Sequence, residues 1–175
     1  DLINTESLQR ENYQIIHYDS PDERGIDVAL LFKKNRFQPT SSKIYPLYLK
    51  RKNGTRDYTR DHLLVSGYLD KDPIHFIINH WPSRSGGQMR SEPGRILAGI
   101  LNKRIIDSIL KFNPKANIIS MGDFNDNPGD KSIKPTLNSV FKKSEIKDDQ
   151  LYNPMDCLLY TSPSPRDSWA SRMPS

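Results

Sequence analysis

The sequence has a single cysteine, no long hydrophobic run and only a small excess of positive charge. The cysteine, Cys157, lies in a C-terminal segment of unusual composition, so cysteine usage gives no information about the redox compartment. No apolar stretch approaches the ~20 residues of a membrane-spanning helix, and no signal-like segment opens the chain, so we expect no membrane span. The formal net charge of +5 is compatible with a polyanionic partner but does not require one. No protein partner can be inferred.

The chain does have the length and apolar content of one domain. It contains 175 residues, of which 35% are hydrophobic and 27% are charged. A chain of this size can bury a substantial core. Residues 1–156 show alternating strand and helix patterns, and we expect them to form a partial α/β domain.

The last part of the chain, residues 157–175, has no periodicity and is rich in serine and proline. Its first eleven residues match the translation of a DNA-sequencing adapter. We therefore predict that residues 157–175 are adapter-derived, are disordered and contribute nothing to function. The alternative interpretation is a natural disordered tail.

Hydrophobic periodicity predicts the main elements. A near-continuous apolar run over Gly25–Lys33 is typical of a strand covered on both faces. Leu63–Tyr68 and Ile74–Asn79 form a predicted hairpin, and apolar residues at every fourth position predict a helix from an N-cap at Ser91 to Asn113. Further predicted elements are a helix running into Tyr13, strands over Tyr13–Tyr18, Ile44–Leu49 and Asn117–Met121, and a turn at Asn53-Gly54.

Polar side chains follow two of the predicted strands. Asn79-His80-Trp81-Pro82-Ser83-Arg84 follows one, and Gly122-Asp123-Phe124-Asn125-Asp126 follows the other. If these strands are parallel and joined by the helix, their ends share an edge, and His80 meets Asp123. If Gly25–Lys33 runs antiparallel to them, Asp27 stands beside His80. These residue types suit metal-assisted phosphoester hydrolysis.

Three segments in order, residues 24–31, 79–87 and 122–128, resemble the motifs of the endonuclease/exonuclease/phosphatase superfamily, the group of deoxyribonuclease I. The similarity runs through nearly all of residues 1–156 and is greatest to a bacterial branch common in Bacteroidetes. The resemblance implies a mixed α/β fold, a four-layer α/β/β/α sandwich. It also implies that this chain is an incomplete copy without the N- and C-terminal parts.

The resemblance implies roles at matching positions. His80 matches the histidine that stabilises charge on a non-bridging phosphate oxygen. Asp27 resembles the acid that keeps this histidine protonated. Asp123 matches the carboxylate that lies near the metal and orients or deprotonates the attacking water, and Asn125 matches the amide that holds this water or a phosphate oxygen. The expected substrate-binding residues are Arg60, Asn79, Ser83 and Arg84.

Each of these residues also has a structural interpretation. An aspartate and an asparagine after a strand usually make a turn. Arg60 and Arg84 suit a surface ion pair as well as a phosphate contact. Trp81 and Phe124 favour core packing over base stacking.

The implied cofactor is Mg²⁺ or Mn²⁺, with Asp123 as a metal ligand. The family's other metal ligands and its second catalytic histidine are expected upstream of Asp1 and beyond Asp156. Magnesium prefers several oxygen ligands, so Asp123 alone would bind it weakly. We therefore expect the chain by itself to have no useful turnover.

Three functions remain open. The first is metal-dependent cleavage of phosphodiesters in nucleic acid, which the arginines at positions 60, 84 and 90 favour. The second is hydrolysis of a small phosphorylated alcohol or a lipid headgroup. The third is a noncatalytic module that binds phosphate or nucleic acid. Fold alone does not choose among them.

Overall fold

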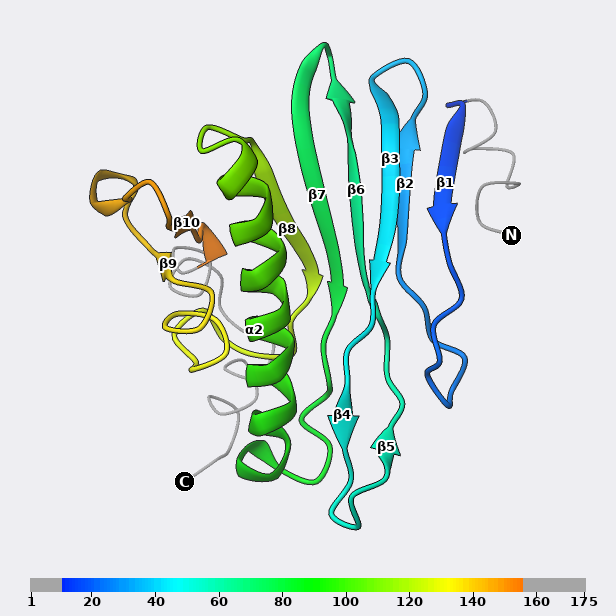
Figure 1. Cartoon of the computed structure of the whole chain (residues 1–175), viewed down its shortest axis with the longest axis vertical. Coiled ribbons are helices and arrows are strands. Elements are labelled where there is room, and N and C mark those ends of the chain that lie inside the picture. Colours follow the sequence, from blue (N-terminus) through cyan, green and yellow to red (C-terminus); the bar gives the residue numbers. More distant parts are fainter. Residues whose placement is uncertain (1–10, 156–175) are drawn as a thin grey trace, which may run out of the picture.

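The computed structural model describes residues 11–155, which form a four-stranded sheet, a long helix and three two-stranded sheets (Figure 1). The predicted adapter-derived segment and most of the predicted N-terminal helix lie outside this range. The main sheet has the strand order β3-β6-β7-β8, with β3 over Phe37–Tyr45, β6 over His62–Leu69, β7 over Asp72–His80 and β8 over Ile118–Asp123. The long helix, α2, spans Gln88–Phe112.

The predicted connections of the central strands are confirmed. β6 and β7 form an antiparallel hairpin in which Leu69 pairs with Asp72. β7 and β8 are parallel and are joined through α2, which gives the expected strand–helix–strand crossover. As a result, the carboxyl ends of β7 and β8 lie at one edge of the sheet.

The helix α2 covers one face of the main sheet. Its buried side chains Ala98, Ile105, Ile106 and Ile109 pack in one cluster with Ile77 of β7 and Trp81. The helix starts earlier than predicted, after Gly86 and Gly87, which both have positive φ. Ser91 is therefore not the N-cap; its hydroxyl donates instead to the carbonyl of Gly87 within the first turn.

The other face of the main sheet is covered by the hairpin of β1 (Tyr13–His17) and β2 (Ala29–Lys33). Val28 and Leu30 from this hairpin pack in a second cluster with Leu63, Val65 and Ile78 of the main sheet. Because successive side chains of a strand point to opposite faces, Ile77 and Ile78 serve different cores. The helix, the main sheet and the hairpin thus form three successive layers.

One predicted strand is divided in the structure. The strand predicted over Ile44–Leu49 is divided between β3, which ends at Tyr45, and β4 (Leu49–Lys50). Pro46 lies between them, and it lacks the N–H that a strand ladder needs. β4 pairs with β5 (Arg56–Asp57) around the predicted turn at Asn53-Gly54.

The remaining elements are short. β9 (Ser139–Val140) pairs in parallel with β10 (Leu151–Tyr152), and a 3₁₀ helix, η2, spans Lys143–Glu145. Among residues 11–155, no helix is both long enough and apolar enough to cross a membrane.

Candidate active site

The candidate site lies where β7 and β8 end, at the lower edge of the sheet in Figure 1. His80 is the last residue of β7, Asp123 is the last residue of β8, and the two are direct register partners. The prediction that these residues converge is confirmed, although they are separated by 43 positions in the sequence.

Gly122 allows the two strands to lie this close. It pairs with Asn79 and has a φ of 127°. A Cβ atom at this position would lie 1.9 Å from the carbonyl oxygen of Asn79, which is a backbone atom that cannot rotate away. The glycine before Asp123 is therefore required by backbone contact.

The loop after β8 turns tightly around the carboxylate of Asp123. The backbone N–H of Asn125 donates to Oδ1 of Asp123 over 2.8 Å, and Asn125 has a left-handed φ of 52°. Asparagine tolerates this conformation. Asp123 is exposed, and its second carboxylate oxygen has no hydrogen bond to another described residue. This oxygen is available to a cation or to a water molecule.

The backbone of Trp81, the residue after His80, is held through both its N–H and its carbonyl group. The N–H of Trp81 donates to the carbonyl of Asp123 over 2.8 Å. The carbonyl of Trp81 accepts hydrogen bonds from Nη2 of Arg60 at 2.7 Å and from Nδ2 of Asn125 at 3.0 Å. The Trp81 side chain is fully buried and packs edge-on against Phe124, as expected for core residues. These contacts fix the backbone on which His80 is carried.

The half-buried imidazole of His80 has a lowered pKa. Burial is the largest cause and the positive charge of Arg60 is the second, while the carboxylate of Asp123 acts in the opposite direction. The ring is therefore neutral at neutral pH. An arriving phosphate would reverse part of this shift, because a nearby negative charge favours the protonated form.

The predicted pairing of Asp27 with His80 is wrong. Asp27 precedes β2, which pairs with β1 outside the main sheet, and its carboxylate contacts Nε2 of His17 at 3.2 Å and the N–H of Ser20 at 2.6 Å. Because β1 and β2 pair His17 with Ala29, the chain just before β2 is drawn to His17. Sequence patterns alone did not reveal this hairpin.

Asp27 instead belongs to a group of possible metal ligands. Ligand atoms of His17, Asp19 and Asp27 all lie within 4.8 Å of one another, and no other such group occurs within residues 11–155. One imidazole and two carboxylates suit several divalent ions. This group and Asp123 are the two places at which the described residues could contribute to holding a cation.

Arg60 is buried and is not a surface ion pair. Its side chain is 3% exposed, and Nη1 donates to the equally buried carboxylate of Asp22 over 3.0 Å. Burial acts to raise the pKa of Asp22, but hydrogen bonds from Arg60 and Arg24 outweigh it and leave the pKa below its usual value. Asp22 was not predicted as a site residue, and its place in a loop before Arg24 gave no signal.

The two residues after Arg60, at the start of β6, are also buried and polar. His62 is 1% exposed, neither of its ring nitrogens has a partner among the described residues, and burial lowers its pKa to about 4. Asp61 beside it has its pKa raised, chiefly by burial. Arg60, Asp61 and His62 thus form a buried polar segment of the core next to the candidate site.

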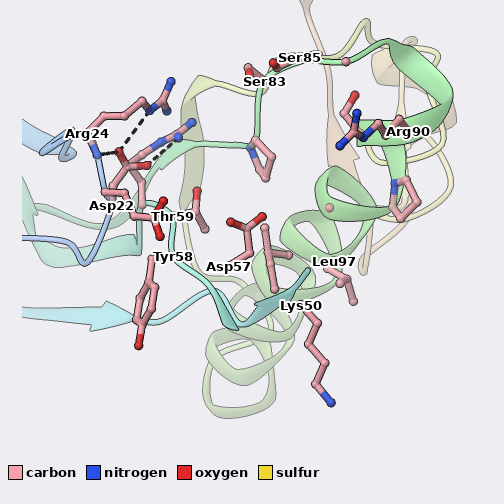
Figure 2. Close-up of a pocket in the computed structure, with 18 residues that line it drawn as sticks. Asp22, Arg24, Lys50, Asp57, Tyr58, Thr59, Ser83, Ser85, Arg90 and Leu97 are labelled. Carbon is pink, nitrogen blue, oxygen red and sulfur yellow. Dashed lines mark hydrogen bonds and ion pairs between the residues drawn. The ribbon is translucent and has the colours of Figure 1, made fainter. Parts of the chain in front are cut away.

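A cavity of about 550 Å³ opens beside this rim (Figure 2). It lies between the loop that carries Asp22, the β4–β5 hairpin, the segment after Trp81 and the first turns of α2. Its lining includes the cationic and hydroxyl side chains of Arg24, Lys50, Tyr58, Arg60, Ser83 and Arg90. Ser83 and Arg60 therefore line a common cavity, as a shared substrate-binding role would require.

Asn79 does not line this cavity. It is 2% exposed, its Nδ2 donates to the carbonyl of Met121 and to the hydroxyl of Ser120, and its Oδ1 accepts from Trp81 and Asn102. These buried bonds tie β7 to β8 and α2. The predicted substrate contact of Asn79 is therefore not formed, because its side chain points into the core.

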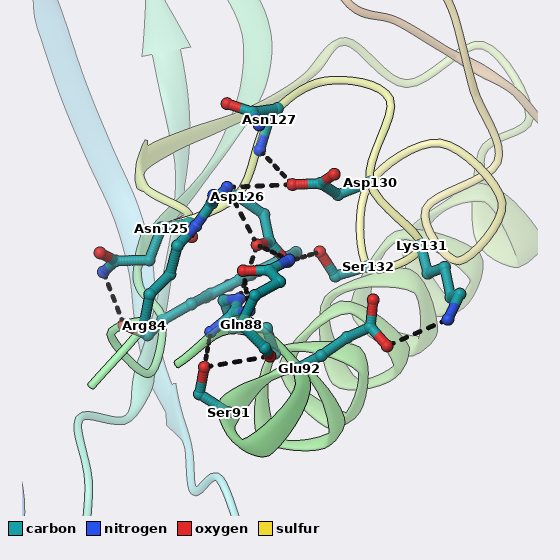
Figure 3. A network of polar contacts seen from close by, with 12 residues as sticks. Arg84, Gln88, Ser91, Glu92, Asn125, Asp126, Asn127, Asp130, Lys131 and Ser132 are labelled. Atoms are coloured by element: carbon teal, nitrogen blue, oxygen red, sulfur yellow. Dashed lines mark hydrogen bonds and ion pairs between the residues drawn. The ribbon is translucent and has the colours of Figure 1, made fainter. Parts of the chain in front are cut away.

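Arg84 reaches across to the loop after β8 (Figure 3). Its Nε donates to the carbonyl of Asn125 over 2.8 Å, and its Nη2 lies 3.0 Å from Asp130 and 3.3 Å from Asp126. The guanidinium is partly exposed, but two carboxylates already engage it. These contacts link the segment after β7 to the loop after β8.

Behind Arg84 lies a buried ion pair that the sequence did not reveal. Nε of Arg95 lies 2.7 Å from Oδ1 of Asp126, and both side chains are completely buried. Burial would raise the pKa of Asp126, but hydrogen bonds from Arg95, Ser132 and Gln88 outweigh burial and lower it. A charged residue within the apolar stretch of α2 was the one signal that could have pointed to this pair.

Comparison with known proteins places these motifs in one family. The sequence profile described as "Endonuclease/Exonuclease/phosphatase family" matches residues 1–169. The match passes the predicted domain boundary at residue 156. No curated protein matches the chain.

Solved structures share the fold. The catalytic domain of human Nocturnin, solved with bound sulfate, is 19% identical with a TM-score of 0.54, and the match covers 74% of this chain and 49% of that one. ANGEL2, a 2',3'-cyclic phosphatase solved with adenosine-2',3'-vanadate, is 17% identical with a TM-score of 0.57 and coverages of 78% and 40%. An endonuclease/exonuclease/phosphatase family protein from Bacteroides thetaiotaomicron is 14% identical, with a TM-score of 0.54 and coverages of 78% and 50%.

The chain thus spans half or less of the length of these proteins. At such identities the likeness concerns the fold alone. The predicted mixed α/β fold of the deoxyribonuclease I-like type is confirmed.

Proposed function

Because the chain belongs to the endonuclease/exonuclease/phosphatase family, we propose that its rim at His80 and Asp123 is part of a phosphoester-hydrolysing site that acts on phosphodiesters of nucleic acid. The observation that carries the proposal is the direct pairing of His80 with Asp123 at the ends of parallel strands. A phosphate bound at this edge would meet an imidazole from one strand and a carboxylate from the next.

Asp123 is the proposed base or orienting group for the attacking water. One of its oxygens is fixed by the N–H of Asn125, and the other is exposed. A carboxylate held in one rotamer can direct a water molecule more effectively than a mobile one. The amide of Asn125, fixed to the carbonyl of Trp81, would hold this water or a phosphate oxygen.

His80 is the proposed stabiliser of charge on a non-bridging phosphate oxygen. Its pKa is lowered in the free protein, so the ring starts neutral. The negative charge that develops on the phosphoryl oxygens favours protonation of the imidazole and a charge-assisted hydrogen bond to the oxygen. Asp123 supports this protonated form, because its carboxylate acts to raise the pKa of His80.

A divalent cation, Mg²⁺ or Mn²⁺, is the proposed cofactor. The free oxygen of Asp123 fits one coordination position, while magnesium usually takes six oxygen ligands, several of them waters. Asp123 therefore contributes one ligand, and the described residues alone would bind the ion weakly. When bound, such an ion polarises phosphoryl oxygens and lowers the pKa of a bound water.

The charge of the cavity beside the rim favours nucleic acid over a small phosphoester. Arg24, Lys50, Arg60 and Arg90 line it, beside the carboxylates of Asp22, Glu23 and Asp57. Asp22 pairs with Arg24 and Arg60, whereas Lys50 and Arg90 have no ion partner among the described residues. A chain of phosphates gains more from two separate cations than a single phosphate does, which favours a polymer of phosphates.

The test uses the full-length protein that carries these residues, because the chain spans about half the length of human Nocturnin's catalytic domain. Plasmid DNA and a panel of small phosphomonoesters are incubated with and without Mg²⁺. We expect metal-dependent cleavage of DNA that falls at least about 100-fold in His80→Ala and in Asp123→Asn. Asp107→Asn, which removes an exposed carboxylate on α2, is the matched control and should retain activity.

Four results would contradict the proposal. DNA cleavage that survives Asp123→Asn would contradict the proposed role of Asp123 as the base. Cleavage that survives chelation would contradict the need for a divalent cation. Hydrolysis of phosphomonoesters without cleavage of DNA would favour the phosphatase interpretation. Binding of DNA without any hydrolysis would favour a noncatalytic module.

A further inference from the structure

The β4–β5 hairpin carries an arginine stacked between two tyrosines. The guanidinium carbon of Arg56 lies 4.5 Å from the centre of the Tyr48 ring and 4.6 Å from the centre of the Tyr58 ring. Both distances are typical of cation–π contacts. The three side chains therefore form a preassembled stack.

The two tyrosines of this stack remain open to solvent. Tyr48 is 67% exposed and Tyr58 is 43% exposed, so each ring offers surface that the protein does not cover. Arg56 is half-buried and has no ion pair with a described carboxylate. The arginine thus orders the rings without burying them, which reduces the entropy that a stacking ligand would have to overcome.

Two lysines of the hairpin have no ion partner among the described residues. Arg51 is neutralised by Glu23 and Asp57, but no described carboxylate lies within ion-pair distance of Lys50 or Lys52. Arg90, at the start of α2, also has no described ion pair. A polyanion beside the stack would therefore meet cations that are free to bind it.

The hairpin lies at the edge of the molecule that carries the candidate active site. Figure 1 shows β4 and β5 extending past the lower ends of β6, β7 and β8. Tyr58 and Lys50 line the same cavity as Ser83 and Arg60 (Figure 2). The cavity beside the candidate site therefore reaches the stack at Tyr58.

We propose that this hairpin is a binding arm for single-stranded nucleic acid, in which a base stacks on the more exposed ring, that of Tyr48, while Lys50 and Lys52 contact the backbone phosphates. The inference rests on the proposed function and names its substrate class. Aromatic side chains take up bases whose faces are unstacked, and such faces are available in single strands but not inside a duplex.

The experiment measures binding of a fluorescently labelled oligo-dT to the chain by anisotropy at constant salt. We expect Tyr48→Ala to weaken binding about tenfold, within the range found for loss of one base–aromatic stack. Tyr48→Phe keeps the ring and should stay within about twofold of the wild type. Tyr68→Ala is the matched control, since Tyr68 is 47% exposed on β6 but lies beside the turn to β7, at the other end of the strands.

A second measurement needs no variant and therefore does not depend on how a variant folds. Addition of oligo-dT should shift the ring proton resonances of Tyr48 and Tyr58 and leave those of Tyr68 in place. Unmoved Tyr48 and Tyr58 resonances would overturn the inference. A Tyr48→Ala protein that binds like the wild type, a loss in Tyr48→Phe as large as that in Tyr48→Ala, or tighter binding of a duplex would do the same.

The result separates this inference from the proposed function. Asp123→Asn should lower hydrolysis in the full-length protein at least about 100-fold, whereas Tyr48→Ala should lower oligo-dT binding about tenfold. If hydrolysis depends on His80 but oligo-dT binding does not depend on Tyr48, the binding arm alone is overturned. Binding that depends on Tyr48 in a protein without hydrolysis would support the arm and overturn the proposed function.

Discussion

Asp126→Asn is expected to lower the free energy of unfolding by about 3–5 kcal/mol, the usual cost of removing one member of a buried ion pair. Arg95 is completely buried and lies 2.7 Å from the Asp126 carboxylate. Without that charge, the guanidinium keeps only neutral acceptors, namely Gln88, Ser91 and the carbonyl of Ser83. Domains of this size are stable by only about 5–15 kcal/mol, so the variant should be close to unfolding.

Urea denaturation followed by circular dichroism measures this change. The matched control is Asp130→Asn in the same loop, which removes a partly exposed carboxylate whose ion partner is the partly exposed Arg84. The control should cost no more than about 1 kcal/mol, as exposed ion pairs usually do. Equal effects of the two substitutions would contradict the importance that we give to the buried pair.

Gly122→Ala is expected to separate β7 from β8 at the candidate site. The new methyl group would lie 1.9 Å from the carbonyl oxygen of Asn79, and alanine would have to adopt a φ of 127°. Overpacking and backbone strain each cost about 1–3 kcal/mol, and here both act at one position. The hydrogen bond from the N–H of Trp81 to the carbonyl of Asp123 lies next to the contact between Gly122 and Asn79, and it should be the first hydrogen bond lost.

Hydrogen exchange of the Trp81 amide measures the opening, because that amide is protected only while the strands stay paired. Gly129→Ala is the matched control: it lies in the loop after β8, and a Cβ there meets no atom within 4 Å. The control should exchange like the wild type. Unchanged protection of the Trp81 amide in Gly122→Ala would mean that the strands stay paired, and it would contradict the requirement for glycine at this position.

The sequence was sufficient to predict those strands and helices whose residue pattern lies within one continuous segment. The two strand-like runs on either side of residues 70–73, the apolar run of β8 and the apolar residues at every fourth position of α2 predicted the order and pairing of these elements. Because a parallel crossover brings strand ends to one edge, the meeting of His80 and Asp123 followed without any coordinates.

The features that the sequence did not predict depend on contacts between distant segments. Asp27 was assigned to His80 on the assumption that its strand joins the main sheet, whereas the β1–β2 hairpin takes it to His17. Asn79 follows a buried strand like a site residue, but its side chain turns inward to Ser120 and Asn102. Nothing in the residue pattern distinguishes an inward amide from an outward one.

Binding of Mn²⁺ to the isotopically labelled chain, followed by paramagnetic broadening of its NMR signals, tests the proposed site most directly. Our account predicts that the signals of His80, Asp123 and Asn125 broaden, and that Asp123→Asn abolishes the effect. Broadening confined to His17, Asp19 and Asp27 and unchanged by Asp123→Asn would contradict it, because the cation would then bind away from the paired histidine and aspartate.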